Sequence, residues 1–321
     1  MGSSLQSPVR EPHGLVFNHV VTPSGARLRY ALCGLQKPNR GTVCLFQGRG
    51  EFIEKYFEVI EDLRRRDFSV ATLDWRGQGG SSRLLKNPRK GHIKSFAQFD
   101  EDLTCFMREV VLPDCPPPFF ALSHSMGGNI VLRALPRRSW FHKAVLTAPL
   151  VDIHFNDRLR GIARAALRLM KLSGGRRMFL PGTLHHPLDT WGPKAQLLTS
   201  DQERFERVVE MVRANPDIGL GGPTIGWICA ALDSIDKLKR EYHAELKLQT
   251  PVLFILAGND RVADNGQARQ LAKRVRNISV VEVRGAQHEL LMEQDVFREQ
   301  VWAAFDSFVE EEKPWRYEEV A

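Results

Sequence analysis

The stretch 123–128, SHSMGG, holds a serine that follows an apolar run and precedes two glycines. A serine nucleophile on a tight strand-to-helix turn usually stands in the pattern G-x-S-x-G, where small residues two positions away allow the sharp turn. Gly127 meets the downstream position, whereas Ser123 replaces the upstream glycine. Ser123 is still small, so we predict that it does not crowd the turn and that Ser125 is the nucleophile. The pattern alone is weak, because an ordinary strand–helix turn would fit it as well.

Two residues near the end of the chain could complete the chemistry. A serine nucleophile needs a general base, and the base needs an orienting carboxylate. Asp260 follows an apolar run in a Gly-Asn-Asp loop, and His288 follows the next such run, 28 residues later. This order and placement suit a triad of Ser125, Asp260 and His288, although each partner could instead be a turn-forming aspartate or a surface histidine. The alternative acids are Asp264 and Asp236.

Acyl transfer also requires hydrogen-bond donors for the developing oxyanion. The backbone N–H of Met126, which follows the nucleophile, is the first expected donor. The loop 45–52, LFQGRGEF, follows an early strand and carries glycines that let the backbone turn an N–H inward. By position, the second donor is Arg49, and the alternative is a plain glycine turn.

Short β-branched and aromatic runs alternate with helical patterns in both halves of the chain. This alternation predicts an α/β fold with a mostly parallel central sheet and helices on both of its faces. The expected strands are 27–34, 41–48, 68–75, 118–123, 143–149, 250–258 and 278–285, and the expected helices 54–66, 95–111, 126–135, 266–275 and 293–310.

The strand–helix rhythm stops at about residue 152 and resumes after residue 238. The patterns between these points are helical, and the flanking pieces are each too short to fold alone. We therefore expect one α/β domain whose core is formed by residues 1–151 and 239–321, with a helical cap or lid insertion at 152–238.

The composition is typical of a globular protein in a reducing compartment. Apolar residues make up 43% and charged residues 26% of the 321 residues, as in ordinary soluble domains. The five cysteines are scattered and lack metal-ligand spacing, so we expect buried free thiols. No signal peptide or membrane-spanning run is evident, which favours the cytoplasm. We expect no cofactor and no metal, because the adjacent His185 and His186 lack carboxylates at fixed spacing.

The formal net charge of +7 has two interpretations. The favoured one is a solvated basic surface, and the other is attraction to an anionic surface. No nucleic-acid motif is present, so we expect no nucleic-acid partner and consider a phospholipid surface the better candidate.

Seven motifs together resemble the bacterial lysophospholipase and monoacylglycerol-lipase-like branch of the α/β-hydrolases. The resemblance runs from about residue 15 to 310 and includes the insertion, so it is more specific than the serine motif alone. It departs from the family at two positions. Ser123 stands in place of the usual glycine, and Gln47 stands where relatives often carry histidine. The motifs are QGRGEFIEKY (47–56), DWRGQGGSS (74–82), SHSMGG (123–128), LTSDQERFER (198–207), GGPTIGW (221–227), AGNDRV (257–262) and GAQHELLME (285–293).

The resemblance implies a serine esterase that acts on a single acyl chain, with Ser125, Asp260 and His288 as the triad. It also implies Arg49 and Met126 as the oxyanion donors and the insertion as a cap over the acyl channel. We therefore expect an enzyme that releases a fatty acid from a lysophospholipid or a monoacylglycerol. A general carboxylesterase, lactonase or acyltransferase of the same fold remains an alternative, as does a catalytically silent binder of small molecules.

The segment 158–177 carries seven basic and no acidic residues. As a helix it would be amphipathic. The apolar face would hold Ile162, Ala165, Ala166, Leu169, Met170 and Leu172, and the largely opposite face Arg160, Arg164, Arg168 and Lys171. We favour a cap helix whose apolar face covers the site and whose basic face is solvated. The alternative is that the basic face contacts an anionic lipid surface, which would place the protein peripherally at the inner membrane.

Overall fold

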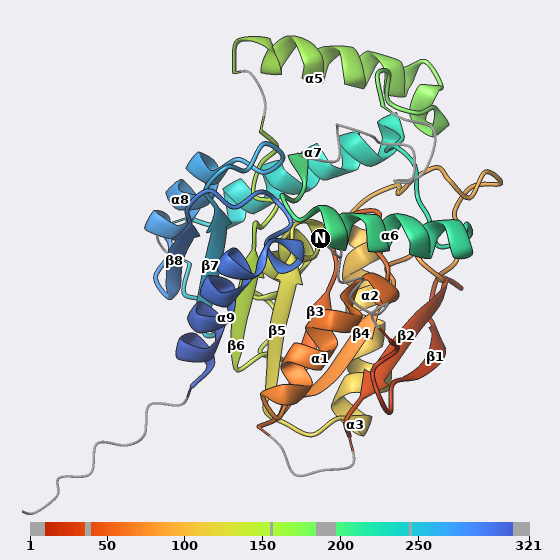
Figure 1. Ribbon diagram of the computed structural model, residues 1–321. Helices are drawn as coiled ribbons and strands as arrows, with labels where there is room; N and C mark the ends of the chain where they lie inside the picture. The colour runs from red at the N-terminus through yellow and green to blue at the C-terminus, as the bar shows by residue number, and fades with distance from the viewer. Residues whose placement is uncertain (1–9, 36–39, 155–156, 184–196, 244–245, 311–321) are drawn as a thin grey trace, which may run out of the picture.

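An eight-stranded sheet forms the centre of the computed structural model, which describes residues 10–35, 40–154, 157–183, 197–243 and 246–310 (Figure 1). The strand order is β1-β2-β4-β3-β5-β6-β7-β8. Strands from β4 to β8 pair in parallel, whereas β1 and β2 pair antiparallel at one edge. The strands are β1 (Val16–Val21), β2 (Arg27–Cys33), β3 (Thr42–Phe46), β4 (Ser69–Leu73), β5 (Phe119–His124), β6 (Lys143–Thr147), β7 (Val252–Ala257) and β8 (Ile278–Val283).

The burial of the strands explains which of them the sequence predicts. Every residue of β3, β4 and β7 is buried, because helices cover both faces of the sheet and select continuous apolar runs. All seven expected strands are present, with ends displaced by at most two residues. Strand β1 was not predicted, since as an edge strand it leaves Val16 and Val21 exposed and lacks a clear alternation. The predicted mostly parallel α/β fold is confirmed.

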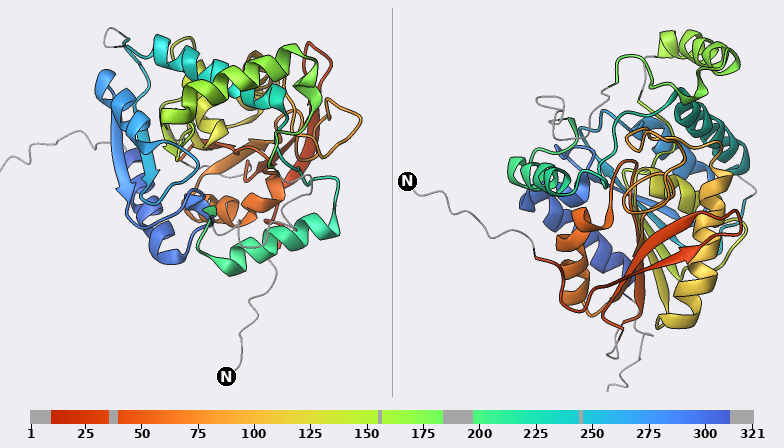
Figure 2. Two further views of the ribbon diagram at one scale, coloured as in Figure 1. Left: turned by 90° about the horizontal axis from the view of Figure 1, so that it is seen from above. Right: turned by 90° about the vertical axis from the view of Figure 1, so that its right-hand side faces the viewer.

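Two hydrophobic cores lie on opposite faces of the sheet. Helices α1 (Phe57–Arg65) and α9 (Asp295–Val309) cover one face, where Val43 and Leu45 of β3 point (Figure 2). The intervening Cys44 and Phe46 point to the other face, because side chains alternate along a strand. That face is covered by α2 (Ala97–Phe106), α4 (Met126–Ala134) and α8 (Asn265–Arg274).

Two of the expected helices are irregular at one end. The predicted helix 54–66 begins with a 3₁₀ turn at Ile53–Tyr56 before α1. The predicted helix 95–111 is α2 followed by a π-helical turn at Met107–Val111, and a short α3 (Leu112–Asp114) follows.

In the described part of the chain between β6 and β7, three α-helices lie above the carboxyl ends of the parallel strands (Figure 1). Helix α7 packs on α4 and belongs to the core of that face, and it runs past the expected boundary at residue 238. Helix α6 packs Val208 and Val212 against Phe52 beside the loop after β3. Helix α5 lies farther out and contacts α7. Their bounds are α5 (Asp157–Leu172), α6 (Gln202–Ala214) and α7 (Ile225–Glu241).

The orientation of α5 differs from the favoured expectation. Ile162, Leu169 and Leu172 are 69%, 69% and 84% exposed and point away from the rest of the protein, whereas Met170 of the expected apolar face lines the cavity beneath the helix. Arg164 and Lys171, expected on a solvated face, instead turn toward α7. They pair with Asp236 at 2.8 Å and with Asp233 at 3.6 Å. The expectation is wrong for the exposed apolar residues and for Arg164 and Lys171, because the acidic residues of α7 attract the basic side chains inward.

All five cysteines are buried and free, as expected. Within the described ranges, no helix is both long enough and apolar enough to cross a bilayer.

Candidate active site

The turn between β5 and α4 presents Ser125 with a backbone conformation that is rare for a side-chain-bearing residue. Its φ of 48° and ψ of −110° are the strained geometry expected of a nucleophile turn. Two neighbouring strands hold the turn, because the Ser125 N–H donates to the Thr147 carbonyl at 3.0 Å. A Cβ at Gly127 would lie 2.5 Å from the Phe46 carbonyl oxygen, so only glycine fits there.

Ser123 is accommodated inside β5, where it pairs in register with Phe46 and Leu146. Its side chain is fully buried, and its hydroxyl has no hydrogen-bond partner among the described residues. This small side chain does not turn Ser125 away, because the Ser125 hydroxyl still reaches a histidine at the opposite side of the turn.

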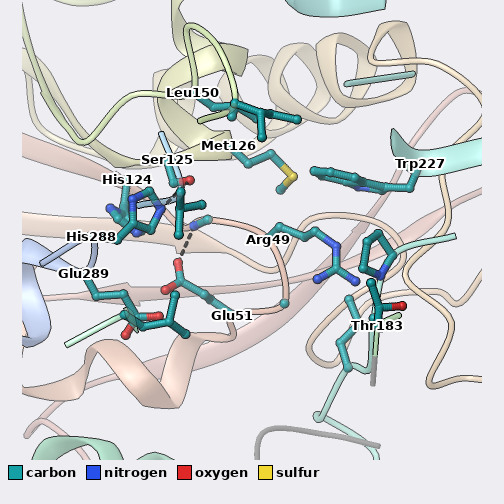
Figure 3. A pocket seen from close by; sticks show the side chains of 18 of the residues that line it. Arg49, Glu51, His124, Ser125, Met126, Leu150, Thr183, Trp227, His288 and Glu289 are labelled. Carbon is teal, nitrogen blue, oxygen red and sulfur yellow. Dashed lines mark hydrogen bonds between the residues drawn. The ribbon is translucent and has the colours of Figure 1, made fainter. Parts of the chain in front are cut away.

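The structure brings Ser125, His288 and Asp260 together from three separate loops at the carboxyl edge of the sheet. Figure 3 shows Ser125 and His288 side by side at the cavity. The Ser125 Oγ lies 3.0 Å from the His288 Nε2, and the His288 Nδ1 lies 2.8 Å from the Asp260 Oδ2. A proton on Nδ1 that is donated to the carboxylate leaves Nε2 free to accept the serine proton. The three side chains therefore form a continuous hydrogen-bonded chain.

Asp260 is held in its ionised form. Burial alone would raise the pKa of this carboxyl group, but the hydrogen bond to His288 and the charge of that residue lower it. Its other oxygen accepts the backbone N–H groups of Val262 and Ala263 at 2.8 and 2.9 Å. The net result is a pKa below the usual value, so Asp260 can orient the imidazole and stabilise its charged form.

The alternative acids have other partners. Asp264 caps the start of α8 by accepting the Gln267 N–H at 3.0 Å, and Asp236 pairs with Arg164. Neither forms a hydrogen bond to His288 within the described residues.

The two expected oxyanion donors lie beside the serine. Met126 is the first residue of α4, where backbone N–H groups have no acceptor within the helix. In the loop after β3, the Gly48 N–H donates to the carboxylate of Glu51. The Arg49 N–H has no hydrogen-bond acceptor among the described residues, and Arg49 and Met126 line the same cavity as Ser125. The geometry therefore leaves these two N–H groups available to a substrate.

A buried ion network behind the serine was missed by sequence reasoning. Lys55 lies 2.6 Å from Glu51 and 2.8 Å from Glu289, so it joins the oxyanion loop to the residue after His288. Burial would raise the pKa of Glu51, but the charge of Lys55 holds it at about 2. Burial would lower the pKa of Lys55, but Glu289 and Glu51 raise it instead. The only sequence pattern that could have indicated this network is the spacing of Glu51 and Lys55, four residues apart, and that spacing is not specific for a functional site.

His124 packs between this network and the triad. Its ring centroid lies 4.8 Å from that of His288, and its Nδ1 lies 3.2 Å from the Thr147 hydroxyl oxygen. Burial lowers the pKa of His124 to about 4, and the neighbouring charge of Glu51 only partly opposes this. His124 is therefore neutral at neutral pH and supports His288 without adding a competing positive charge.

The site opens into a cavity of about 400 Å³ (Figure 3). Ser125 and His288 lie at one side, and the Arg49 guanidinium lies beside Trp227 and Thr183 at the other. A second cavity of about 360 Å³ continues beneath α5 and shares Ile153 and Ile228 with the first. The apolar walls of the two cavities are Met126, Leu150, Ile153, Leu197, Leu198, Leu220, Val262, Ala163, Leu167, Met170, Leu180 and Leu232.

No cluster of three metal-ligating side chains occurs in the parts of the chain that the structure describes. The paired His185 and His186 lie outside those residues. The hydrogen-bonded chain of serine, histidine and aspartate can perform acyl transfer with its own groups.

The chain is similar in sequence to one protein family and to several known enzymes. A family model described as serine aminopeptidase, S33, matches residues 37–295. The chain is 27% identical to a probable lysophospholipase L2 of Haemophilus influenzae, over 92% of this chain and 88% of that protein. It is 29% identical to lysophospholipase L2 of Escherichia coli K12, over 80% of this chain and 76% of that protein.

A solved structure shows the same fold. A soluble variant of monoglyceride lipase from Saccharomyces cerevisiae, in complex with a substrate analog, superposes with a TM-score of 0.72. The two chains are 18% identical, and the match covers 96% of this chain and 99% of the other.

Proposed function

We infer the activity of this chain from its family: it belongs to the α/β-hydrolases described as serine aminopeptidase, S33. We propose that it is a serine ester hydrolase that releases the fatty acid from a lipid with a single acyl chain, a lysophospholipid or a monoacylglycerol. The observation that carries the proposal is the Ser125–His288–Asp260 chain opening into an apolar cavity. The family description names a peptidase, but relatives that match 80% or more of the chain are named lysophospholipase L2 and monoglyceride lipase.

In the proposed mechanism, His288 accepts the proton of the Ser125 hydroxyl through Nε2 as Oγ attacks the ester carbonyl carbon. The carbonyl oxygen becomes an oxyanion that accepts the N–H groups of Arg49 and Met126. The tetrahedral intermediate then breaks its bond to the alkoxy oxygen, which takes the proton from His288 and leaves as the alcohol. An acyl-enzyme on Ser125 remains. Asp260 stabilises the positive charge of His288 in both steps.

The second half of the reaction repeats these roles with water. His288 accepts a proton from a water molecule, which attacks the acyl carbon of the acyl-enzyme. The oxyanion forms again in front of Arg49 and Met126, and collapse of the intermediate returns the proton to Ser125 Oγ. The fatty acid leaves, and the free enzyme is restored.

The cavities support a long apolar acyl group as the part of the substrate that is recognised. Apolar side chains line the walls near Ser125, and the second cavity beneath α5 continues from Ile153 and Ile228. Each buried methylene of an acyl chain contributes about 0.8 kcal/mol of transfer free energy. We propose the segment 152–238 as the cap of this acyl site, since α5 and α7 form its upper wall.

We also propose that the outer face of α5 contacts an anionic membrane surface from the cytoplasmic side. Ile162, Leu169 and Leu172 are exposed there, and Arg168 is exposed on the same helix. Exposed apolar side chains with nearby basic groups are typical of helices that lie at a lipid interface. The five free cysteines favour a reducing compartment. Binding to vesicles tests this part of the proposal.

The decisive experiment for catalysis replaces Ser125 by alanine. Ser125→Ala is expected to abolish hydrolysis of lysophospholipids, monoacylglycerols and p-nitrophenyl acyl esters, and His288→Ala should do the same because triad members act as a unit. A fluorophosphonate probe should label the unmodified chain and leave Ser125→Ala unlabelled. Full activity of Ser125→Ala on p-nitrophenyl esters would disprove the mechanism, and failure to label the unmodified chain would favour a catalytically silent binder.

A further inference from the structure

Some charged side chains of the main cavity have an ion-pair partner of opposite charge, and one does not have such a partner among the described residues. Lys55 pairs with both Glu51 and Glu289 in the buried network. Arg49 lines the same cavity, and no carboxylate pairs with it within the described residues. Its positive charge is therefore available to the cavity.

The guanidinium of Arg49 is held firmly in place. Its Nη2 donates to the Gly221 carbonyl at 2.6 Å, and its central carbon lies 5.2 Å from the ring centroid of Trp227. A Cβ at Gly91 would lie 2.4 Å from Nη2, so the absence of a side chain at that position makes room for the guanidinium. Stacking and one carbonyl bond fix its direction but do not neutralise its charge.

Part of the hydrogen-bonding capacity of Arg49 is unused. Its Nε is buried and has no partner among the described residues. Burial lowers the pKa of Arg49 to about 10, which still leaves it protonated at neutral pH. A buried cation without an anion is unfavourable, because its lost hydration is not replaced. A ligand that brings a negative charge to this side of the cavity would supply the missing partner.

We propose that the Arg49 side chain binds the phosphate of a lysophospholipid headgroup and selects this substrate over the uncharged monoacylglycerol. The inference rests on the proposed ester hydrolysis at Ser125. Arg49 would then act twice, through its backbone N–H at the oxyanion and through its guanidinium at the headgroup.

The layout of the cavity suits this division of the substrate. The apolar extension beneath α5 begins at Ile153 and Ile228, whereas the guanidinium lies beside Trp227 and Thr183 (Figure 3). An ester bound at Ser125 therefore has an apolar region for its acyl chain and a cationic region for its alcohol. The planar donor fork of arginine matches the geometry of phosphate oxygens.

The test compares two substrates that differ only in the phosphate. Short-chain 1-acyl-glycerol and 1-acyl-glycerol 3-phosphate, both kept monomeric, exclude any effect of a charged lipid aggregate. The unmodified chain should have the higher kcat/KM on the phosphate-containing substrate. Arg49→Gln should lower the ratio of the two kcat/KM values by about 10- to 100-fold, as expected for a hydrogen-bonded charge. Arg49→Lys, which keeps the charge without the fork, should retain part of the ratio.

Arg108→Gln is the matched control, because Arg108 is exposed on the π-helical turn after α2 and does not line the cavity. This variant should keep the ratio of the unmodified chain. Fluorophosphonate labelling of Ser125 verifies that each variant is folded with an open site. An unchanged ratio in Arg49→Gln, or a preference of the unmodified chain for the uncharged substrate, would overturn the proposal. Absence of hydrolysis of either substrate by the labelled unmodified chain would instead overturn the proposed function.

A binding measurement separates the headgroup from free phosphate. Glycerol 3-phosphate should slow the labelling of Ser125 in the unmodified chain and should protect Arg49→Gln at least tenfold less strongly. Inorganic phosphate should protect less than glycerol 3-phosphate. Equal protection by both would overturn the headgroup assignment, because the site would then recognise phosphate alone.

Discussion

The loops at the carboxyl edge of the sheet and the helix α5 above them differ in which side chains they bury and which they expose. Around Ser125 the charged side chains of Glu51, Lys55 and Glu289 are largely buried and paired, whereas Arg49 has no carboxylate partner among the described residues. On α5 the basic residues Arg164 and Lys171 turn inward to α7, whereas the apolar Ile162, Leu169 and Leu172 face outward. The buried ion pairs hold the loop after β3 and the loop of His288 in fixed positions beside Ser125. The arrangement on α5 leaves an apolar surface that nothing in the described chain covers.

The largest expected effect concerns the carboxylate that orients His288. Asp260→Asn should lower kcat by about 10⁴-fold, because an amide stabilises the wrong tautomer of the imidazole and cannot balance its charge. The hydrolysis of p-nitrophenyl acyl esters measures this loss. Asp264→Asn is the matched control, since asparagine also caps helices well and Asp264 caps α8.

Asp264→Asn should retain an activity close to that of the unmodified chain. If Asp264→Asn lost as much activity as Asp260→Asn, the assignment of the orienting acid to Asp260 would be wrong.

The second prediction concerns the buried network. Lys55→Met removes the cation between Glu51 and Glu289, so two carboxylates are left close together without compensation. Breaking a buried ion pair from one side costs about 3 to 5 kcal/mol of unfolding free energy. Urea unfolding monitored by circular dichroism measures it. The rate of ester hydrolysis should also fall, because Glu51 holds the Gly48 N–H of the oxyanion loop.

The double variant Glu51→Gln/Lys55→Met is the control for this idea. It removes opposite charges together, so it should be less destabilised than Lys55→Met alone. Equal or additive destabilisation would show that the ions contribute independently and do not act as a network.

The sequence predicted the triad residues that the structure brings together because their positions follow from local rules. Ser125, Asp260 and His288 each lie in the loop that follows a strand of the parallel part of the sheet, and such strand ends meet at one edge. Glu51 and Lys55 gave no comparable signal, because a charged pair at this spacing occurs on many exposed helices. Their role depends on burial against Glu289, which lies far away in the chain.

The orientation of α5 could not be predicted for a different reason. An amphipathic pattern shows that a helix has two unlike faces, but it does not show which face turns to the protein. Here the acidic residues Asp233 and Asp236 of α7 decide the orientation, and they lie about 70 residues farther along the chain. The edge strand β1 was missed because exposed valines do not mark a buried run.

A third and smaller effect concerns the junction between α6 and the core. Glu58 of α1 pairs with Arg204 of α6 and Arg298 of α9, both at 2.6 Å. Burial would raise the pKa of Glu58, but these arginines hold it at about 2. The folded pKa is below the unfolded value, so the stabilisation is complete above pH 4.5 and is lost as the pH falls toward 2.

Glu58→Gln should therefore lower the unfolding free energy at pH 7 by about 1 to 2 kcal/mol, a figure reduced for partial exposure. The difference between Glu58→Gln and the unmodified chain should shrink as the pH falls from 4.5 to 2. Urea unfolding at several pH values measures it, and Glu61→Gln on the same helix is the control. A difference that stayed constant down to pH 2 would exclude an origin in the ionised carboxylate.

The smallest expected effect on stability lies on the outer face of α5. Leu169 is 69% exposed, so Leu169→Ser should change the unfolding free energy by less than about 0.5 kcal/mol. The same change should weaken binding to anionic phospholipid vesicles about tenfold, because the leucine loses its apolar contact with the bilayer. Co-sedimentation with vesicles measures the binding.

Leu167→Ser is the matched control, because Leu167 lies two residues away, is half-buried and lines the cavity beneath α5. It should destabilise the protein by about 1 to 2 kcal/mol and leave vesicle binding as in the unmodified chain. The two leucines thus separate the two faces of one helix. Equal loss of vesicle binding in both variants would mean that the membrane contact depends on the integrity of the helix and not on its outer face, and the proposed membrane surface would have to be abandoned.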